Sequence, residues 1–366
     1  MNIGYLVNFK WYPPQGGGTV HAYQVAHQLA RRGHKIKTIF YWHQAPGLEV
    51  YRQRELFKFL RDIDVLYIRL HGDWAFEGWT LLKVLKLFRL PVVWEINSPL
   101  EELITRGMRT ERQVRSLNAR RKFLSKLVDA GICVSTVMKD YAADYLGIKK
   151  TYVVPNGSDP KQFSPEQRDF LAYKEHPNHF KVLWSGSAGY GWQGIKIISE
   201  VAERIYSLDK DIIFILITNK QHLKGYNVFD KNVVILDEKK YTDLPPYIAS
   251  ADAGLCLYQN YGWNGRFYFS PLKLFDYMAS GLPVIASDLG QISEVITHKE
   301  NGLLTDNKIE HIIDEILFLK KTPSEAKRLG KKARESVVKY YNWERVAQET
   351  ETILRGLVRK TPGSGR

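Results

Sequence analysis

The clearest indication of the fold comes from residues 270–287, which read SPLKLFDYMASGLPVIAS. Ser270 is a typical helix N-cap, and Pro271 at the first helical position loses no hydrogen bond there. We therefore expect a helix from Leu272 to Ser280. Residues 283–287 are mostly apolar and predict a buried strand directly after that helix. The segment thus indicates one helix–strand unit of a parallel sheet.

The start of this helix also carries groups suited to a nucleotide. Its free N–H groups, together with Lys273, favour a bound diphosphate. Asp276 lies one turn further along, and its carboxylate can accept two hydrogen bonds from the vicinal hydroxyls of a ribose. Residues three apart occupy neighbouring positions on one helix face. The alternative is a capped surface helix on which Lys273 and Asp276 form an ion pair.

Strand and helix patterns alternate on both sides of this segment. A less regular stretch over residues 155–178 separates two such series and has the composition of a linker. We expect two doubly wound, Rossmann-like parallel sheets whose facing carboxyl ends leave a ligand cleft. The strands are expected at 3–7, 35–41, 65–68, 92–96, 132–135 and 151–154, and at 181–184, 212–217, 233–236, 254–258 and 283–287, with helices at 21–32, 194–206 and, broken at 340–342, 309–357.

Composition narrows the class of protein. With 366 residues, of which 44% are hydrophobic, the chain suits two packed domains. Cys133 and Cys256 each lie in an apolar run, so we expect buried thiols without a disulfide, as in a reducing compartment. Neither a leader peptide nor a membrane-spanning run of about 18 apolar residues is visible. These features predict a soluble, cytoplasmic protein, and the tail over residues 361–366 is expected to be loose.

The formal charge of +14 points to an anionic partner. Nucleic acid, an anionic membrane surface and phosphate-bearing substrates all fit that charge. No nucleic-acid-binding module is recognisable, and we expect no nucleic-acid partner.

A run of three glycines, Gly16-Gly17-Gly18, follows the first predicted strand and precedes the first predicted helix. Such a loop allows close approach of a ligand and leaves helix N–H groups free for an anion. The alternative is a tight turn alone. The dinucleotide pattern G-x-G-x-x-G is absent and no acidic residue ends the second predicted strand at Phe40-Tyr41-Trp42, which argues against a nicotinamide dehydrogenase.

Several ordered motifs over nearly the whole chain resemble the GT-B glycosyltransferases of family 4. They include residues 16–21, the segment 95–102, Val134-Ser135, the segment 154–159, residues 270–287, Glu294-Val295-Ile296 and residues 301–304. Asn342-Trp343-Glu344 resembles the start of the last helix, which in this family crosses back to the N-terminal domain. The resemblance implies an acceptor-side domain over residues 1–160, a nucleotide-sugar-binding domain over 175–340 and the returning helix over 341–358.

The resemblance also implies a donor site. Asp276 matches the acid that binds the nucleotide ribose, Ser270, Pro271, Leu272 and Lys273 match the phosphate-facing turn, and Gly17 and Gly18 match a loop facing the donor phosphates or the acceptor. The chain departs from the family pattern at four positions. Tyr268 stands where the family has its first acid, Ser187 and Gln193 replace the Arg and Lys that bind the diphosphate, and Asn97 replaces a histidine. Arg266 is a candidate to supply the missing guanidinium, and the alternative is a solvated loop arginine.

For the mechanism, we find no carboxylate pair typical of a double-displacement glycosidase and no Asp-x-Asp metal motif in the donor region, so neither a cofactor nor an obligatory metal is expected. Positive charge and helix dipoles would assist departure of the nucleoside diphosphate. The resemblance implies front-face substitution with retention. His21, Glu95 and Asn97 are the candidates for contact with the acceptor or the reacting centre, and for His21 a purely structural role is the alternative.

A basic stretch from Arg106 to Lys126 accounts for much of the excess charge, with Arg109, Arg112 and Arg115 opposite an apolar sector if the stretch is one helix. It is consistent with an anionic membrane surface and a lipid-linked acceptor, as the family resemblance implies, or with an ordinary solvated face. The sequence thus favours sugar transfer from a nucleoside-diphosphate-sugar to a glycan or lipid-linked acceptor in cell-surface polysaccharide or glycoconjugate synthesis. A catalytically silent sugar-nucleotide-binding subunit and a nucleotide-sugar epimerase are the alternatives.

Overall fold

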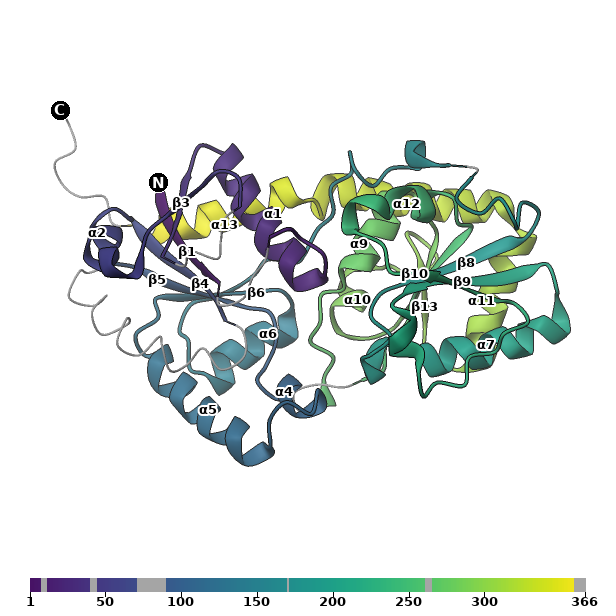
Figure 1. The fold of residues 1–366 in the computed structure, drawn as a ribbon, viewed down its shortest axis with the longest axis horizontal. Coiled ribbons are helices and arrows are strands. Elements are labelled where there is room, and N and C mark those ends of the chain that lie inside the picture. Colours follow the sequence, from purple (N-terminus) through teal and green to yellow (C-terminus); the bar gives the residue numbers. More distant parts are fainter. Residues whose placement is uncertain (8–11, 40–44, 71–89, 170, 261–264, 359–366) are drawn as a thin grey trace.

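A computed structural model describes residues 1–7, 12–39, 45–70, 90–169, 171–260 and 265–358. Three predictions therefore fall partly or wholly outside the described residues. These are the end of the second strand at residues 40–42, the part of the Arg266 loop at residues 262–264, and the tail at residues 361–366. Two lobes are visible, each built around one sheet (Figure 1).

The N-terminal domain contains a fully parallel sheet in the order β3-β2-β1-β4-β5-β6-β7. Its central strands are buried along their whole length because helices cover both faces, which explains their nearly continuous apolar sequences. Each predicted strand is present, but the strand predicted at 132–135 lies at 130–133 and the one predicted at 35–41 ends at Thr38. Strand β3 was not predicted because it has only three residues, one of them charged. The strands are β1 (Asn2–Val7), β2 (Lys35–Thr38), β3 (Leu48–Val50), β4 (Val65–Leu70), β5 (Val92–Ile96), β6 (Ala130–Cys133) and β7 (Thr151–Val153).

The C-terminal domain repeats this arrangement in a second parallel sheet, in the order β10-β9-β8-β11-β12-β13. In both sheets the chain winds outward from a central strand first in one direction and then in the other, as predicted for a doubly wound fold. The short β13 was not predicted. The strands are β8 (Phe180–Ser185), β9 (Ile212–Thr218), β10 (Val233–Asp237), β11 (Ala253–Cys256), β12 (Val284–Ser287) and β13 (Leu303–Thr305).

Helices surround both sheets. The longer ones are α1 (Gly17–Arg31), α5 (Glu111–Ser125), α7 (Ile195–Leu208), α9 (Leu272–Ala279), α11 (Ile309–Lys321), α12 (Pro323–Tyr340) and α13 (Trp343–Leu357). Shorter helical segments are η1 (Gln53–Glu55), α2 (Leu56–Arg61), α4 (Glu102–Thr105), α6 (Thr136–Asp140), η2 (Tyr141–Tyr145), η3 (Pro165–Gln167), η4 (Gly191–Gln193), η5 (Lys220–Leu223), η6 (Tyr241–Asp243), α8 (Pro245–Ala249) and α10 (Gly290–Val295).

The predicted start of the first helix, at residue 21, was wrong. Helix α1 already begins at Gly17, because Oγ1 of Thr19 accepts hydrogen bonds from the backbone N–H groups of Gln15 (2.9 Å) and Gly16 (3.0 Å) and closes the first turn. Gly17 and Gly18 thus belong to the first turn of a helix, and not to a loop before it.

The basic stretch from Arg106 to Lys126 is not one helix either. The chain turns at Gly107, which has a φ of 67°, and α5 starts afresh behind the N-cap Thr110. Arg106 and Arg109 therefore lie outside α5, and Arg121 within it is buried at 2% exposure.

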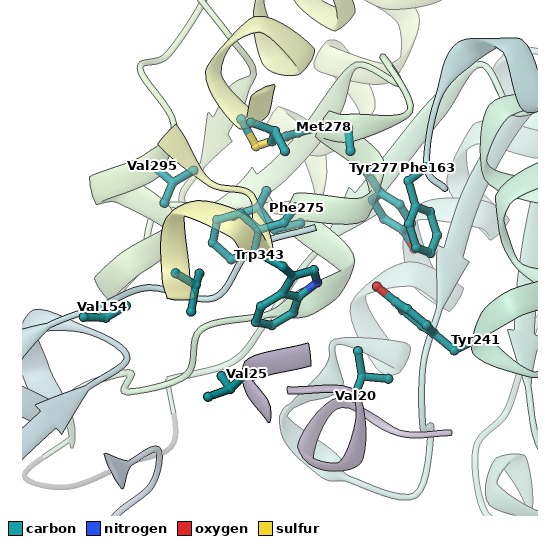
Figure 2. Close-up of a cluster of buried hydrophobic side chains, with 14 of the residues drawn as sticks. Val20, Val25, Val154, Phe163, Tyr241, Phe275, Tyr277, Met278, Val295 and Trp343 are labelled. Atoms are coloured by element: carbon teal, nitrogen blue, oxygen red, sulfur yellow. The ribbon is translucent and has the colours of Figure 1, made fainter. Parts of the chain in front are cut away.

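The C-terminal helix α13 returns to the N-terminal domain and lies beside α1 (Figure 1). Glu351 on α13 forms an ion pair with Arg32 at 2.5 Å, and its Oε1 lies 3.1 Å from Nε2 of His34. Trp343 at the start of α13 is fully buried among side chains of both domains, including Val20 and Val25 of α1 and Phe275 of α9 (Figure 2). One apolar cluster thus continues from one domain into the other.

Both cysteines are free and buried, as predicted. Within the described residues, no helix combines the length and the hydrophobicity needed to cross a membrane.

Candidate active site

The start of α9 is tied to the segment that links the two domains. The predicted N-cap was wrong, because the helix begins at Leu272 with Pro271 as its N-cap. Ser270 instead accepts a hydrogen bond at Oγ from the backbone N–H of Asn156 (3.1 Å), and its carbonyl accepts one from Nδ2 of Asn156 (2.6 Å). Asn156 therefore binds the residue that would otherwise cap the helix.

Lys273 is a half-buried cation without a carboxylate partner in the described part of the chain. Its Nζ donates to Oε1 of Gln193 at 2.9 Å and lies 4.2 Å from the ring centroid of Trp184 and 5.3 Å from that of Tyr258. Burial lowers the pKa of Lys273 to about 7. An anion placed beside this amine would restore its charge and gain a charge-assisted hydrogen bond.

Asp276 is the matching buried acid. Its side chain is 3% exposed, and Oδ1 accepts hydrogen bonds from Oγ of Ser158 (2.6 Å) and from the hydroxyl of Tyr241 (3.0 Å). Burial raises the pKa of Asp276 to about 7, although the two hydroxyl groups partly offset this increase. Because α9 is buried from Leu274 to Ala279, it is not the surface helix that was the alternative prediction.

The glycine run lies next to this helix. A Cβ added to Gly17 would meet Cδ1 of Leu272 at 3.6 Å, so the first turn of α1 packs beside the first turn of α9. Gly17 and Gly18 are exposed to solvent. Residues 255 positions apart in sequence therefore come together, and the structure places both predicted phosphate-facing turns at one point.

His21 and Glu95 lie in a closed ionic cluster between the N-terminal sheet and α1. Nε2 of His21 is 2.8 Å from Oε1 of Glu95, which also pairs with Arg69, and the hydroxyl of Tyr5 donates to Oε2 of Glu95 at 3.0 Å. Glu95 is only 1% exposed. Burial alone would raise the pKa of Glu95, but His21 and Arg69 hold it well below its usual range. This carboxylate is therefore ionised and fully compensated.

Asn156 connects that cluster to α9. Its Oδ1 is hydrogen bonded to Nδ1 of His21, while its Nδ2 donates to the carbonyl of Ser270. Since a carbonyl only accepts, the amide orientation is determined and Nδ1 of His21 must donate. With the Glu95 carboxylate at Nε2, both ring nitrogens of His21 face acceptors. Asn156, Ser158 and Tyr241 were not predicted as site residues, although residues 156 and 158 lie in one of the motifs that carry the family resemblance.

Tyr268 and Asn97, which depart from the family pattern, and the candidate cation Arg266 lie in different surroundings. Tyr268 is 3% exposed, and its backbone carbonyl accepts a hydrogen bond from Oγ of Ser135 at 3.0 Å, so this residue joins the domains. Oδ1 of Asn97, just after β5, is buried and has no hydrogen-bond partner in the described residues. The guanidinium of Arg266 lies 2.9 Å from Oδ2 of Asp140 on α6 and is thus already engaged by a carboxylate.

The side chains of the basic stretch from Arg106 to Lys126 differ in their contacts and exposure. Arg106 pairs with Glu102 and lies 4.7 Å from the ring centroid of Tyr190 in the other domain. Arg115 forms an exposed pair with Glu111 at 3.2 Å. Met108 and Phe123 are large exposed apolar side chains of the same stretch, at 57% and 53% exposure.

Two family models match this chain. Residues 36–162 match the family model described as glycosyltransferase family 4, and residues 179–321 match the one described as glycosyl transferases group 1. The chain belongs to glycosyltransferase family 4. The two matched segments lie in the N-terminal and C-terminal domains of this family 4 protein respectively.

Curated relatives of this family 4 member are distant. A chitobiosyldiphosphodolichol beta-mannosyltransferase of Candida albicans is 26% identical over 51% of this chain and 44% of its own length. An N-acetyl-alpha-D-glucosaminyl L-malate synthase of Bacillus anthracis is 27% identical over 45% of this chain and 40% of its own length. The chain thus spans less than half the length of these relatives.

Solved structures share the fold over almost the whole chain. Sucrose-phosphate synthase from Thermosynechococcus elongatus gives a TM-score of 0.72 at 16% identity, covering 97% of this chain and 98% of that one. Anabaena HepE in complex with UDP gives 0.73 at 16% identity, covering 97% and 100%. These similarities establish the GT-B architecture of the family 4 chain.

Proposed function

We propose that this protein transfers a sugar from a nucleoside-diphosphate-sugar to a glycan or lipid-linked acceptor, in cell-surface polysaccharide or glycoconjugate synthesis. The observation that carries the proposal is the pair of charges on α9. Lys273 and Asp276 are three residues apart, and neither has an oppositely charged partner among the described residues. A donor nucleotide suits both groups, since its diphosphate is an anion that can pair with Lys273 and its ribose hydroxyls can donate hydrogen bonds to the Asp276 carboxylate.

Some of the other predicted donor contacts lie close to this pair. Residues 270–272 and Gly17 and Gly18 lie at the paired first turns of α9 and α1, and Gln193 is hydrogen bonded to Lys273. In the proposed mechanism, Lys273 in its protonated form and the N-terminus of α9 stabilise the charge that develops on the departing diphosphate. The names of relatives support sugar transfer in general, and one solved structure of the same fold holds UDP.

We propose retention of the anomeric configuration. The relatives do not decide this point, because their names include a beta-mannosyltransferase and an alpha-(1->4)-mannosyltransferase. Inversion needs a general base beside the acceptor hydroxyl. Among the candidates predicted from sequence, His21 and Glu95 are buried and paired with each other, which favours a positioning role for both. Nuclear magnetic resonance of the first-formed product gives the anomer directly, and an inverted product would refute this part of the proposal.

We further propose that transfer needs no metal ion or other cofactor, because Lys273 and helix N–H groups can balance the charge of the diphosphate. Undiminished turnover in EDTA is the expected result. Loss of turnover that Mg²⁺ or Mn²⁺ restores would show the opposite.

The exposed basic residues of α5, with Met108 and Phe123, are proposed to bind an anionic membrane surface at the cytoplasmic side. Sedimentation with phosphatidylglycerol-containing vesicles at low salt, and release at high salt, is expected. The variant Arg112→Glu/Arg115→Glu should sediment less. If wild type does not sediment, this face is an ordinary solvated one.

The decisive experiment is incubation of the full chain with UDP-, GDP- and ADP-sugars and lipid or glycan acceptors, followed by mass spectrometry of products. Transfer from one donor class, lost in Asp276→Ala, is the expected result. A changed sugar nucleotide without any acceptor would indicate an epimerase. Tight donor binding without any product would indicate a silent sugar-nucleotide-binding subunit.

A further inference from the structure

Ser187 and Gln193, which stand where the family has an arginine and a lysine, share an unexpected feature. Each contacts a basic side chain that comes from a different element. Oγ of Ser187 is 3.2 Å from Nδ1 of His222, and Oε1 of Gln193 accepts from Nζ of Lys273 at 2.9 Å. His222 belongs to η5, directly after β9, whereas Lys273 is on α9. The basic groups that the loop itself lacks are thus brought to it from outside.

The loop after β8 is shaped for this close approach. Residues 186–194 contain four glycines and neither a lysine nor an arginine. A Cβ added to Gly189 would lie 3.3 Å from the His222 ring, and one added to Gly186 would lie 2.9 Å from Nζ of Lys273. The latter distance is one that real Cβ atoms essentially never show. Side chains at these positions would therefore push the two basic groups away from the loop.

His222 is also accessible to a ligand. The residue is exposed, and its Nδ1 faces the hydroxyl of Ser187, which can either donate or accept. Its Nε2 makes no hydrogen bond within the part of the chain described by the structure. The ring therefore has one nitrogen that holds it beside the loop and one that remains open. Arg266, the other candidate cation, is held by Asp140 at 2.9 Å.

We propose that His222 is a second cationic contact to the donor diphosphate, in addition to Lys273, at the loop formed by residues 186–194. This inference rests on the proposed function. A diphosphate carries more than one negative charge, so a single lysine compensates only part of it. The imidazole of His222 supplies a further hydrogen-bond donor for the diphosphate, at a loop that has no lysine or arginine of its own.

The test compares His222→Gln and His222→Arg with wild type by isothermal titration calorimetry, using UDP, GDP, uridine, guanosine and inorganic pyrophosphate as probes. His222→Gln should weaken nucleoside diphosphate and pyrophosphate binding about tenfold and leave nucleoside binding unchanged, since only a hydrogen bond to a charged group is lost. His222→Arg should restore wild-type affinity. His311→Gln is a matched control, because His311 is exposed and contacts Asp306 on the surface.

Each other outcome has a defined meaning. If His222→Gln binds the diphosphate as tightly as wild type, the proposal for His222 is wrong and the proposed function stands. If His222→Gln loses nucleoside binding equally, or His222→Arg fails to restore affinity, the residue acts through loop shape and not through charge, and the proposal is also wrong. If wild type binds neither UDP, GDP nor pyrophosphate, the inference fails, and the proposed function fails as well if ADP is not bound either.

Discussion

Two groups of charges lie close to the boundary between the domains, and they differ in how their charges are compensated. In the N-terminal domain, the Glu95 carboxylate is surrounded by Arg69, His21 and a tyrosine hydroxyl. On α9, Lys273 and Asp276 have only neutral partners in the described residues, and burial brings both pKa values to about 7. The charge of Glu95 is compensated by its neighbours, whereas the charges of Lys273 and Asp276 are not.

This difference separates a structural role from a ligand-binding one. A buried charge that is paired and hydrogen bonded stabilises one arrangement of the chain, whereas a buried charge without a counterion costs folding free energy unless a ligand supplies it. The comparison therefore supports a positioning role for the cluster of Glu95 and His21 and the proposed donor site on α9. Asn156 joins the two groups, so that the donor helix is held in place by the cluster of Glu95 and His21.

The largest expected effect is loss of stability on breaking the cluster of Glu95 and His21. Glu95→Gln removes the carboxylate that pairs with both His21 and Arg69. Neutralising one partner of a buried ion pair costs about 3–5 kcal/mol, which urea unfolding at pH 7 would measure. Glu111→Gln, at an exposed pair on α5, should leave the unfolding free energy unchanged. Wild-type stability with lost turnover would instead assign Glu95 to the chemistry.

The second effect has the opposite sign. Asp276→Asn should stabilise the protein at pH 8, because the raised pKa makes the ionised form unfavourable in the folded state while the amide oxygen still accepts from Ser158 and Tyr241. The penalty builds up from about pH 4, the unfolded pKa, to about pH 7, the folded one. The gain in unfolding free energy is on the order of 2–4 kcal/mol at pH 8 and less than half of that at pH 5. A destabilised variant at pH 8 would contradict the comparison.

Lys273→Met tests the second of the two uncompensated charges on α9. It should weaken binding of the matching nucleoside diphosphate about 100-fold, since a desolvated charge contact is lost. Thermal stability at pH 7 should rise, because the folded state holds this amine with a pKa of about 7 and so disfavours its charged form. That gain should fade as the pH rises toward about 10.4, where the unfolded lysine also becomes neutral. Unchanged affinity would remove Lys273 from the site.

The smallest effect concerns a third, more solvated cluster. Burial alone would raise the pKa of Glu351, but Arg355 and Arg32 hold it at about 2. Glu351→Gln should lower the unfolding free energy by about 1 kcal/mol at neutral pH, because the pair with Arg32 joins α13 to the end of α1 and the pair with Arg355 lies within α13. The depressed pKa means that the contribution is lost as the pH falls from about 4 through about 2. A difference that persisted at pH 2 would point to packing and not to charge.

Most of the fold was predictable from the sequence because buried parallel strands are nearly continuous apolar runs. The strand over residues 212–217 was recognisable for this reason. The last helices were recognisable from their helical periodicity. Boundaries were less predictable where side chains compete for the same backbone groups. Thr19 starts α1 at Gly17, and Asn156 takes the hydroxyl of Ser270 away from helix capping.

The candidate site was predictable only in part. Lys273 and Asp276 are close together in the chain, so local spacing was sufficient to predict them. His222, Ser158 and Tyr241 reach the site from other elements, and only the tertiary structure brings them there. The engagement of Arg266 by Asp140 could not be predicted for the same reason.

The most direct test of the account is calorimetric titration of wild type, Asp276→Asn and Lys273→Met with UDP, GDP and ADP and the corresponding sugar nucleotides at pH 8, with and without EDTA, in two buffers of different ionisation enthalpy. We expect wild type to bind one nucleotide class regardless of EDTA and to take up protons as it does so, because the diphosphate recharges Lys273. Both variants should bind much more weakly, and proton uptake should decrease in Lys273→Met. Binding that is unchanged in both variants, or the absence of binding by any of these nucleotides to wild type, would contradict the claim that the uncompensated charges of α9 form the donor site.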